Sequence, residues 1–424
     1  MRFSRGALRA WLQKPTMIRI ILLISIQAFL ALLFDIVGLG AGSIGTFTFL
    51  RNANTFVLLL YPPILSSDGG IGVLSSRLGT ALHLGSVKPQ LFRNEDYFYT
   101  LISAVLTLGL FNGIWIGGLS YITNLIIAGK NRILNPLPFI ITPILTLTLA
   151  SLISSQLTSL LAFFVFQKGL NPDVWVYPTM STINNVLSTL FYAGIIAVIK
   201  PVDWFNADLW SGAKITATTY FMLIPVVAYL GFMGVIVWKN HKKKNYWKVI
   251  REAVPIQTVT LTINSLTGGI LSGAESSLKN LPQLFLIYPA LIDTLADECT
   301  IVSNTMSTNL SLGSLEPQVK AIKDEDFWTN LLGVGMAGLA LHFIYGIFGS
   351  LIVFNFRGFG ITLAIALLIN ALGFIVVQGT IFVLIILSFR RGLDPDNFAV
   401  PIIAALANLV CSSLILFFTF AFQI

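Results

Sequence analysis

Three acidic residues, Asp293, Asp297 and Glu298, interrupt an otherwise apolar stretch that runs from about residue 281 to residue 317. On a helix, Asp293 and Asp297 share one face, so two carboxylates come within reach of a single cation. Hard cations take oxygen ligands, and Mg²⁺ keeps several waters while one or two carboxylates bind it. The acids therefore predict a divalent cation site at bilayer depth. Two alternatives are open: a position nearer the outer surface, or pairing with Arg77.

Further candidate ligands lie outside this stretch. Asp68 precedes a glycine-rich segment, and Asn185 and Asn408 each stand seven residues after a proline in two similar segments. Amide oxygens can ligate a cation directly or through its waters, but Asn is also a common interhelical hydrogen-bond former. Both roles remain open, and on a two-fold axis the two asparagines would face each other. Asp35, near the outer end of the first apolar stretch, which is expected to end near Val37, is an alternative intramembrane acid, and the interface is its favoured place.

The elements that position these residues are predicted to be membrane helices. Hydrophobic residues make up 55% of the 424 residues and charged residues only 10%, whereas soluble domains carry about a quarter charged residues. The apolar stretches predict about eleven spans of roughly 20 residues, and no long stretch remains for a soluble domain. The spans are expected to start near Met17, Thr55, Tyr97, Leu137, Val174, Thr216, Ala253, Leu284, Phe327, Ile361 and Phe398.

The positive charges predict the orientation of these spans. They gather before the first span and, from Lys239 to Arg251, after the sixth, and such clusters favour the cytoplasmic side. The N-terminus is therefore expected in the cytoplasm and the C-terminus outside the cell membrane. Because the basic residues lie in short loops between apolar spans, the net charge of +8 indicates topology and no nucleic-acid partner.

An internal repeat organises the chain. Ser75–Pro89 is echoed by Ser303–Pro317 at an offset of 228 residues (317 − 89), and Lys168–Asp173 is echoed by Arg391–Asp396. Each copy has five predicted spans, and an extra span near residue 216 makes the copies parallel. The expected units are a first repeat at 1–200, a linking helix and basic loop at 201–252, and a second repeat at 253–424. A pathway on the shared axis follows, although duplication could merely enlarge a helical bundle.

At the repeated blocks the chain resembles the MgtE-type magnesium transporter family, in the fused two-domain form of the MgtE-related solute carriers. Ser75–Thr80 and Ser307-Thr308 are similar to the family's S-R-L-S-T stretch, and residues 170–173 and 393–397 are similar to its L-D-P-D-N loop. The resemblance implies a pore between two domains that carries Mg²⁺ or a related cation. However, Asn185 and Asn408 stand where the family has an ion-holding aspartate. Its Gly-Asn pair is replaced by Asp68-Gly69 and by Ala296-Asp297.

The sequence thus predicts an all-α integral membrane protein that transports a divalent cation, with Mg²⁺ first, through a pathway between its repeats. It is expected to act as a monomeric pseudo-dimer in the lipid bilayer, to need no cofactor and not to be an enzyme. One alternative is a transporter of another cation or small solute. Another is a Mg-dependent intramembrane enzyme acting on lipid diphosphates, which would need cationic phosphate ligands near the acids. The absence of a G-x-x-x-x-G-K-[ST] run argues against ATP-driven transport.

Overall fold

The computed structural model describes residues 17–48, 55–67, 70–127, 136–169, 172–199, 220–311, 315–356, 358–391 and 399–422. Every regular element in these ranges is helical, and eight of them are long and apolar enough to cross a membrane. Asp68, Asn171 and residues 392–398 lie outside the described residues, so the predictions made for them have no structural counterpart here.

The first half of the chain, up to residue 199, begins with a helix that changes its winding. It contains α2 (Met17–Leu32), the 3₁₀ segment η1 (Leu33–Val37), α3 (Gly38–Thr48), α4 (Thr55–Leu65), α5 (Ile71–His83), α6 (Asp96–Ile127), α7 (Pro136–Gln167) and α8 (Pro172–Ile199).

The helix α10 (Leu223–Asn240) comes next, and the second half of the chain follows it. The second half contains α11 (Lys244–Gly273), α12 (Glu275–Asn280), α13 (Pro282–Ser311), η4 (Val319–Lys323), α14 (Glu325–Val353), α15 (Phe359–Arg390) and α16 (Ala399–Ala421).

The first apolar segment is longer than its sequence suggested. The expected span ended near Val37, but α2, η1 and α3 together form one candidate membrane span from Met17 to Phe47. The continuation is rich in glycine, which weakens a helix on its own but lets a neighbouring backbone come close. Asp35 consequently lies in the middle of this candidate span and is 1% exposed, which favours its alternative placement as an intramembrane acid over a place at the interface.

Helices also occupy the remaining predicted positions, although not all meet the criteria for a span. The pair α4–α5 is made of two short helices, and α11 and α13 are not among the eight candidates. In α13 the three acids interrupt the apolar sequence, and the first turns of α11 carry Lys244, Lys248 and Arg251.

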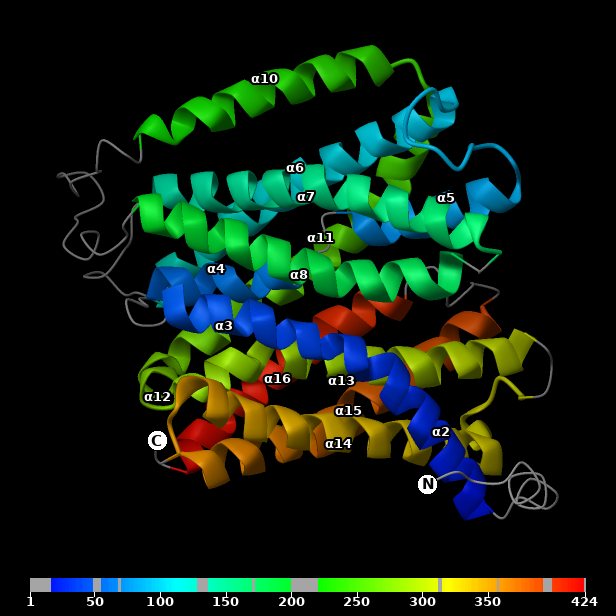
Figure 1. The fold of residues 1–424 in the computed structure, drawn as a ribbon, viewed down its shortest axis with the longest axis vertical. Helices are drawn as coiled ribbons and strands as arrows, with labels where there is room; N and C mark the ends of the chain where they lie inside the picture. The colour runs from blue at the N-terminus through cyan, green and yellow to red at the C-terminus, as the bar shows by residue number, and fades with distance from the viewer. Residues whose placement is uncertain are drawn as a thin grey trace.

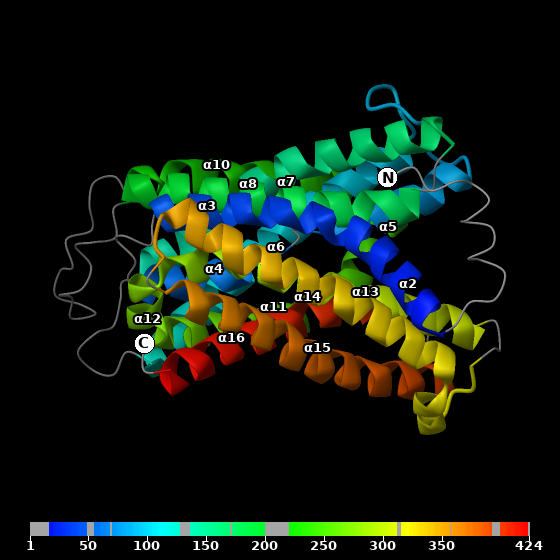
Figure 2. The same ribbon diagram turned by 60° about the horizontal axis from the view of Figure 1, so that its bottom comes forward.

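The two halves exchange their first helices. In the first half, α3 packs on α13 and α2 packs on α14; in the second half, α11 packs on α4 and α6. Figures 1 and 2 show α2 and α3 in blue, running along the helices of the second half. Equivalent glycines allow both contacts: Gly42 meets the backbone of Leu286, and Gly268 meets the backbone of Leu59. The offsets are 226 (268 − 42) and 227 (286 − 59) residues.

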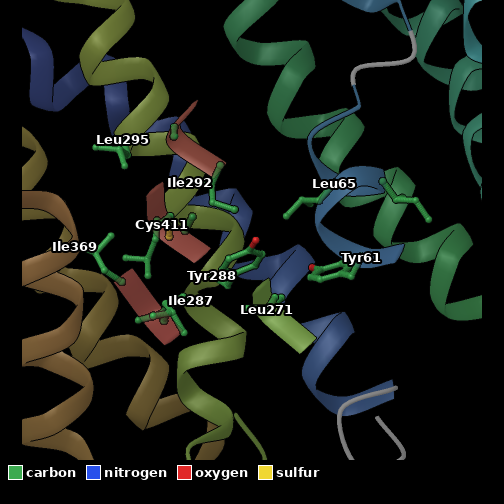
Figure 3. Close-up of a cluster of buried hydrophobic side chains, with 14 of the residues drawn as sticks. Tyr61, Leu65, Leu271, Ile287, Tyr288, Ile292, Leu295, Ile369 and Cys411 are labelled. Atoms are coloured by element: carbon green, nitrogen blue, oxygen red, sulfur yellow. The ribbon is translucent and has the colours of Figure 1, made fainter. Parts of the chain in front are cut away.

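Aromatic side chains fill the centre between the halves (Figure 3). The ring of Tyr61 on α4 lies 6.3 Å from that of Tyr288 on α13 and 5.1 Å from that of Phe285. Tyr61 and Tyr288 are equivalent residues of the two repeats, at an offset of 227 (288 − 61), and both are fully buried. The apolar core is therefore continuous across the seam between the two halves.

Candidate cation site

The acids of the second half meet the first half where η1, α8 and α13 pack together. The side-chain amide of Asn185, on α8, donates to both carboxylate oxygens of Asp293, on α13, at 2.9 and 3.0 Å. Asn185 is buried and Asp293 is partly buried. This contact joins the two halves through one of the predicted ligand pairs.

Asp35 brings a third carboxylate to the same place. Its carboxyl group interacts electrostatically with that of Asp297, one turn along α13 from Asp293. The hydroxyl of Thr294 donates to Asp35 Oδ2 at 3.0 Å and lies 2.7 Å from the hydroxyl of Tyr345, on α14. Asp35, Asp293 and Asp297 thus form a cluster, which we call the acid cluster, made from η1 and α13.

The acid cluster has no basic counterpart in the described part of the chain, where no lysine or arginine forms an ion pair with its members. Arg77, the alternative partner that the sequence offered, instead pairs with Glu252 on α11. Two unit charges about 4 Å apart repel by about 4 kcal/mol at an effective dielectric constant of 20. Carboxylates this close therefore need a shared proton or a cation between them.

The arrangement suits a cation that keeps part of its water shell. Among the described residues, no three or more histidine, cysteine, aspartate or glutamate side chains are grouped closely enough to hold a metal ion directly. Mg²⁺ dehydrates reluctantly and is usually bound through one or two carboxylates and several waters. Asp35 and Asp297 provide such a pair, and Asp293 adds negative charge beside it.

Glu298 belongs to a different environment from that of the other two acids of α13. Its Oε1 accepts a hydrogen bond of 2.6 Å from the amide of Asn370, on α15, and lies 4.0 Å from His342 Nδ1, on α14. All three side chains are buried, and Glu298 sits against Gly338, where any side chain would collide with it. The structure therefore directs Glu298 toward the packed interior of the second half, away from Asn185.

Asn408 occupies the position equivalent to Asn185 but has different partners. Its amide nitrogen donates to Thr267 Oγ1 at 3.0 Å and to Asn264 Oδ1 at 3.2 Å, and its oxygen accepts from the Tyr288 hydroxyl at 2.8 Å. Asn408 is fully buried, so this neutral network leaves it little capacity to bind an ion. The expectation that the two asparagines face each other is not met, because each bonds to a different set of side chains.

The hydrogen-bond networks of Asn185 and Asn408 nevertheless lie at corresponding positions in the two halves. Asn185 lies between the first helix of its own half and α13 of the other, while Asn408 lies between α11 and α4, with Pro62 O at 3.5 Å from its amide. Acidic side chains surround Asn185, whereas neutral amides and hydroxyls surround Asn408. Among the described residues, the charged arrangement is therefore present at one of the two places.

Sequence reasoning missed part of the acid cluster. Asp35 was named as an acid near the end of the first apolar stretch, but that stretch was expected to end near Val37 and its place among the other acids was not foreseen. Thr294 and Tyr345 gave no signal, because a threonine beside an acid and a tyrosine in an apolar helix are ordinary features of membrane helices.

Comparison with known families agrees with this geometry. The sequence profile of MgtE, described as a divalent cation transporter, matches residues 61–195 and again residues 288–419. The chain belongs to the MgtE family. The two MgtE regions contain Asn185, Asp293 and Asp297 but not Asp35. Comparisons with curated proteins and with solved structures gave no match. MgtE proteins are transporters, so the chain is a multi-pass membrane protein of a divalent cation transporter family.

Proposed function

We propose that this MgtE protein transports Mg²⁺ through a pathway at the seam between its halves, with the acid cluster as its ion-binding site. The observation that carries the proposal is the convergence of Asp35 with Asp297 and of Asn185 with Asp293. Each contact joins the two halves, and no basic residue neutralises the acids in the described ranges. A doubly charged cation balances this charge better than a monovalent one does.

The proposed architecture has eleven spans, in two parallel repeats of five helices joined by α10. The repeats comprise residues 1–200 and 253–424, with the linking helix and basic loop at 201–252 between them. The matching exchanges of α3 and α11 support a two-fold relation. In Figure 1 the chain enters α2 on the side where α10 turns into α11 and leaves α16 on the opposite side. This placement supports a cytoplasmic N-terminus and basic turn, and a C-terminus outside.

Transport through this site needs a change of conformation. Asp35 is 1% exposed, and the aromatic rings of Tyr61, Phe285 and Tyr288 pack beside the seam. Asp293 and Asp297 are partly exposed, but a hydrated ion reaches Asp35 only when helices on one side move apart. The exchanged first helices are suited to this movement, because each contacts both halves.

Flux in proteoliposomes tests the proposal. The wild-type protein is expected to load vesicles with Mg²⁺, read by a trapped magnesium-sensitive dye, and the double variant Asp293→Asn/Asp297→Asn to abolish the loading. Asp326→Asn, the same change at an exposed acid of α14, serves as the control and should leave flux unchanged. Flux of the double variant at the wild-type rate would exclude the acid cluster as the ion site.

Competition separates Mg²⁺ from other substrates. Excess Mn²⁺ is expected to compete with Mg²⁺, whereas Na⁺ and small organic cations should not at equal concentration, because they bring less charge to the three carboxylates. Inhibition by Na⁺ or an organic cation but not by Mn²⁺ would favour the alternative of another cation or small solute. The enzyme alternative gains no support, since no lysine or arginine pairs with the acids in the described ranges.

A further inference from the structure

The turn between α10 and α11 carries a dense cluster of positive charge that the transport site does not use. Six basic residues lie within 239–251, and all but Lys243 are exposed: Lys239, Lys242, Lys244, Lys248 and Arg251. Lys243 pairs with Asp96 at 2.6 Å. None of the five exposed residues forms an ion pair within the described parts of the chain. A free positive surface of this density indicates an anionic partner.

An apolar cavity begins beside these charges. Its volume is about 420 Å³, and its walls are Trp247, Ile250, Arg251, Val254 and Pro255. Pro255 lies inside α11 and has no backbone N–H, so the helix lacks one backbone hydrogen bond at this turn. The cavity thus combines one guanidinium group with an aromatic ring and aliphatic side chains.

The charges and the cavity share one face of α11. Lys244, Lys248 and Arg251 follow one another at spacings of four and three residues, which places them on a single stripe of the helix. Pro255 continues the stripe one turn further along. A ligand bound along it meets positive charge at one end and an apolar wall at the other.

We propose that this face of α11 binds an anionic phospholipid, with the headgroup phosphate at Lys244, Lys248 and Arg251 and the start of an acyl chain in the cavity. The adjacent α10 is a candidate membrane span that ends at Asn240, which places the basic turn at the level of the headgroups. Basic clusters next to a membrane span attract anionic lipids electrostatically. Lipid is favoured over nucleic acid because the apolar cavity adjoins the charges. The inference depends on the membrane position of the chain and not on the transported ion.

Lipid binding can be measured on the purified full-length protein by fluorescence quenching. Phosphatidylglycerol with brominated acyl chains quenches tryptophans that it contacts, and Trp247 in the cavity wall is the expected reporter. Titration should show saturable quenching, and brominated phosphatidylcholine should give at least 10-fold weaker binding. Trp247→Phe, which keeps an aromatic wall, should remove most of the saturable signal.

A matched pair of variants tests the assigned charges. Lys248→Gln/Arg251→Gln is expected to weaken phosphatidylglycerol binding at least 10-fold. Arg390→Gln/Arg391→Gln, which removes the same charge from two exposed residues at the end of α15, should leave it unchanged. Equal losses in both variants would indicate diffuse attraction and overturn the site. Equal binding of phosphatidylcholine, or displacement by glycerol phosphate at the concentration at which the lipid binds, would also overturn it. Retained Mg²⁺ flux by both variants shows that they are folded.

Discussion

Replacing Asp35 by Asn isolates the contribution of the first helix to the acid cluster. The change keeps the shape of the side chain and an oxygen that accepts from Thr294, which now donates to Asp35 Oδ2 at 3.0 Å. It removes one of the two carboxyl groups that meet between η1 and α13. The fold should therefore persist while the charge of the site falls by one.

The expected loss of Mg²⁺ affinity in Asp35→Asn can be calculated from the charges. At an effective dielectric constant of about 20, a divalent cation about 4 Å from a carboxylate gains about 8 kcal/mol, and two carboxylates at that distance repel by about 4 kcal/mol. Removing Asp35 loses this attraction, whereas the repulsion is present with and without the ion and cancels from the binding free energy, so the loss before screening is at most about 8 kcal/mol. Water and the remaining acids, Asp293 and Asp297, screen part of it. We expect Mg²⁺ affinity to fall between about 10-fold and about 1000-fold.

Thermal unfolding with and without Mg²⁺ measures this loss. At a concentration 100 times the wild-type dissociation constant, Mg²⁺ stabilises the wild-type protein by about 2.7 kcal/mol, and a 10-fold weaker site halves that value to about 1.4 kcal/mol. Without Mg²⁺, Asp35→Asn should be at least as stable as the wild type, because a repulsion has been removed. Asp326→Asn should resemble the wild type in both conditions. Wild-type Mg²⁺ stabilisation of Asp35→Asn would refute the role of Asp35, and so would a large loss of stability without Mg²⁺.

The same substitution should have opposite effects at the two asparagines. Asn185→Asp adds charge to the acid cluster and should strengthen Mg²⁺ binding. Asn408→Asp loses two donated hydrogen bonds in a buried network and should lower the free energy of unfolding by about 3 kcal/mol or more; equal effects of the two variants would contradict the difference between their surroundings. Gly42→Ala should destabilise the packing between the two halves, because the added methyl group collides with backbone atoms of α13. Gly40→Ala is the control, because its methyl group has no neighbour within 4 Å, and the unfolding temperature should fall only for Gly42→Ala. Asn370→Ala removes the donor to the buried glutamate of α13 and should lower stability by about 1–3 kcal/mol while leaving Mg²⁺ affinity intact, as titration would show.

Sequence patterns predicted the helical class and the positions of the long helices well, because apolar length is a direct requirement of the bilayer. They also named Asp293 and Asp297 as ligands, which stays a prediction. These predictions depend on local spacing, which the sequence displays. Family membership agrees with the repeated blocks, since the two matched regions begin at Tyr61 and Tyr288.

The exchange of first helices could not be read from the sequence. The sequence around Gly42 does not indicate that its neighbour is Leu286. The contact of Asp35 with α13 depends on the same long-range packing. The partners of Asn185 and Asn408 also depend on long-range packing, which equal local sequences do not reveal.

The exchange has a consequence for the biogenesis of the protein. Asp35 enters the membrane with the first helix, but its partner Thr294 is 259 residues further along the chain. At about 5–20 residues per second, synthesis of that interval takes roughly 10 to 50 seconds. Meanwhile an acid in the middle of a membrane helix costs about 2.5–3.5 kcal/mol. The first helix therefore reaches its stable position only after α13 is inserted. A chain whose synthesis stops before α13 leaves Asp35 without its partner in the membrane, and this unpaired acid distinguishes it from the finished protein.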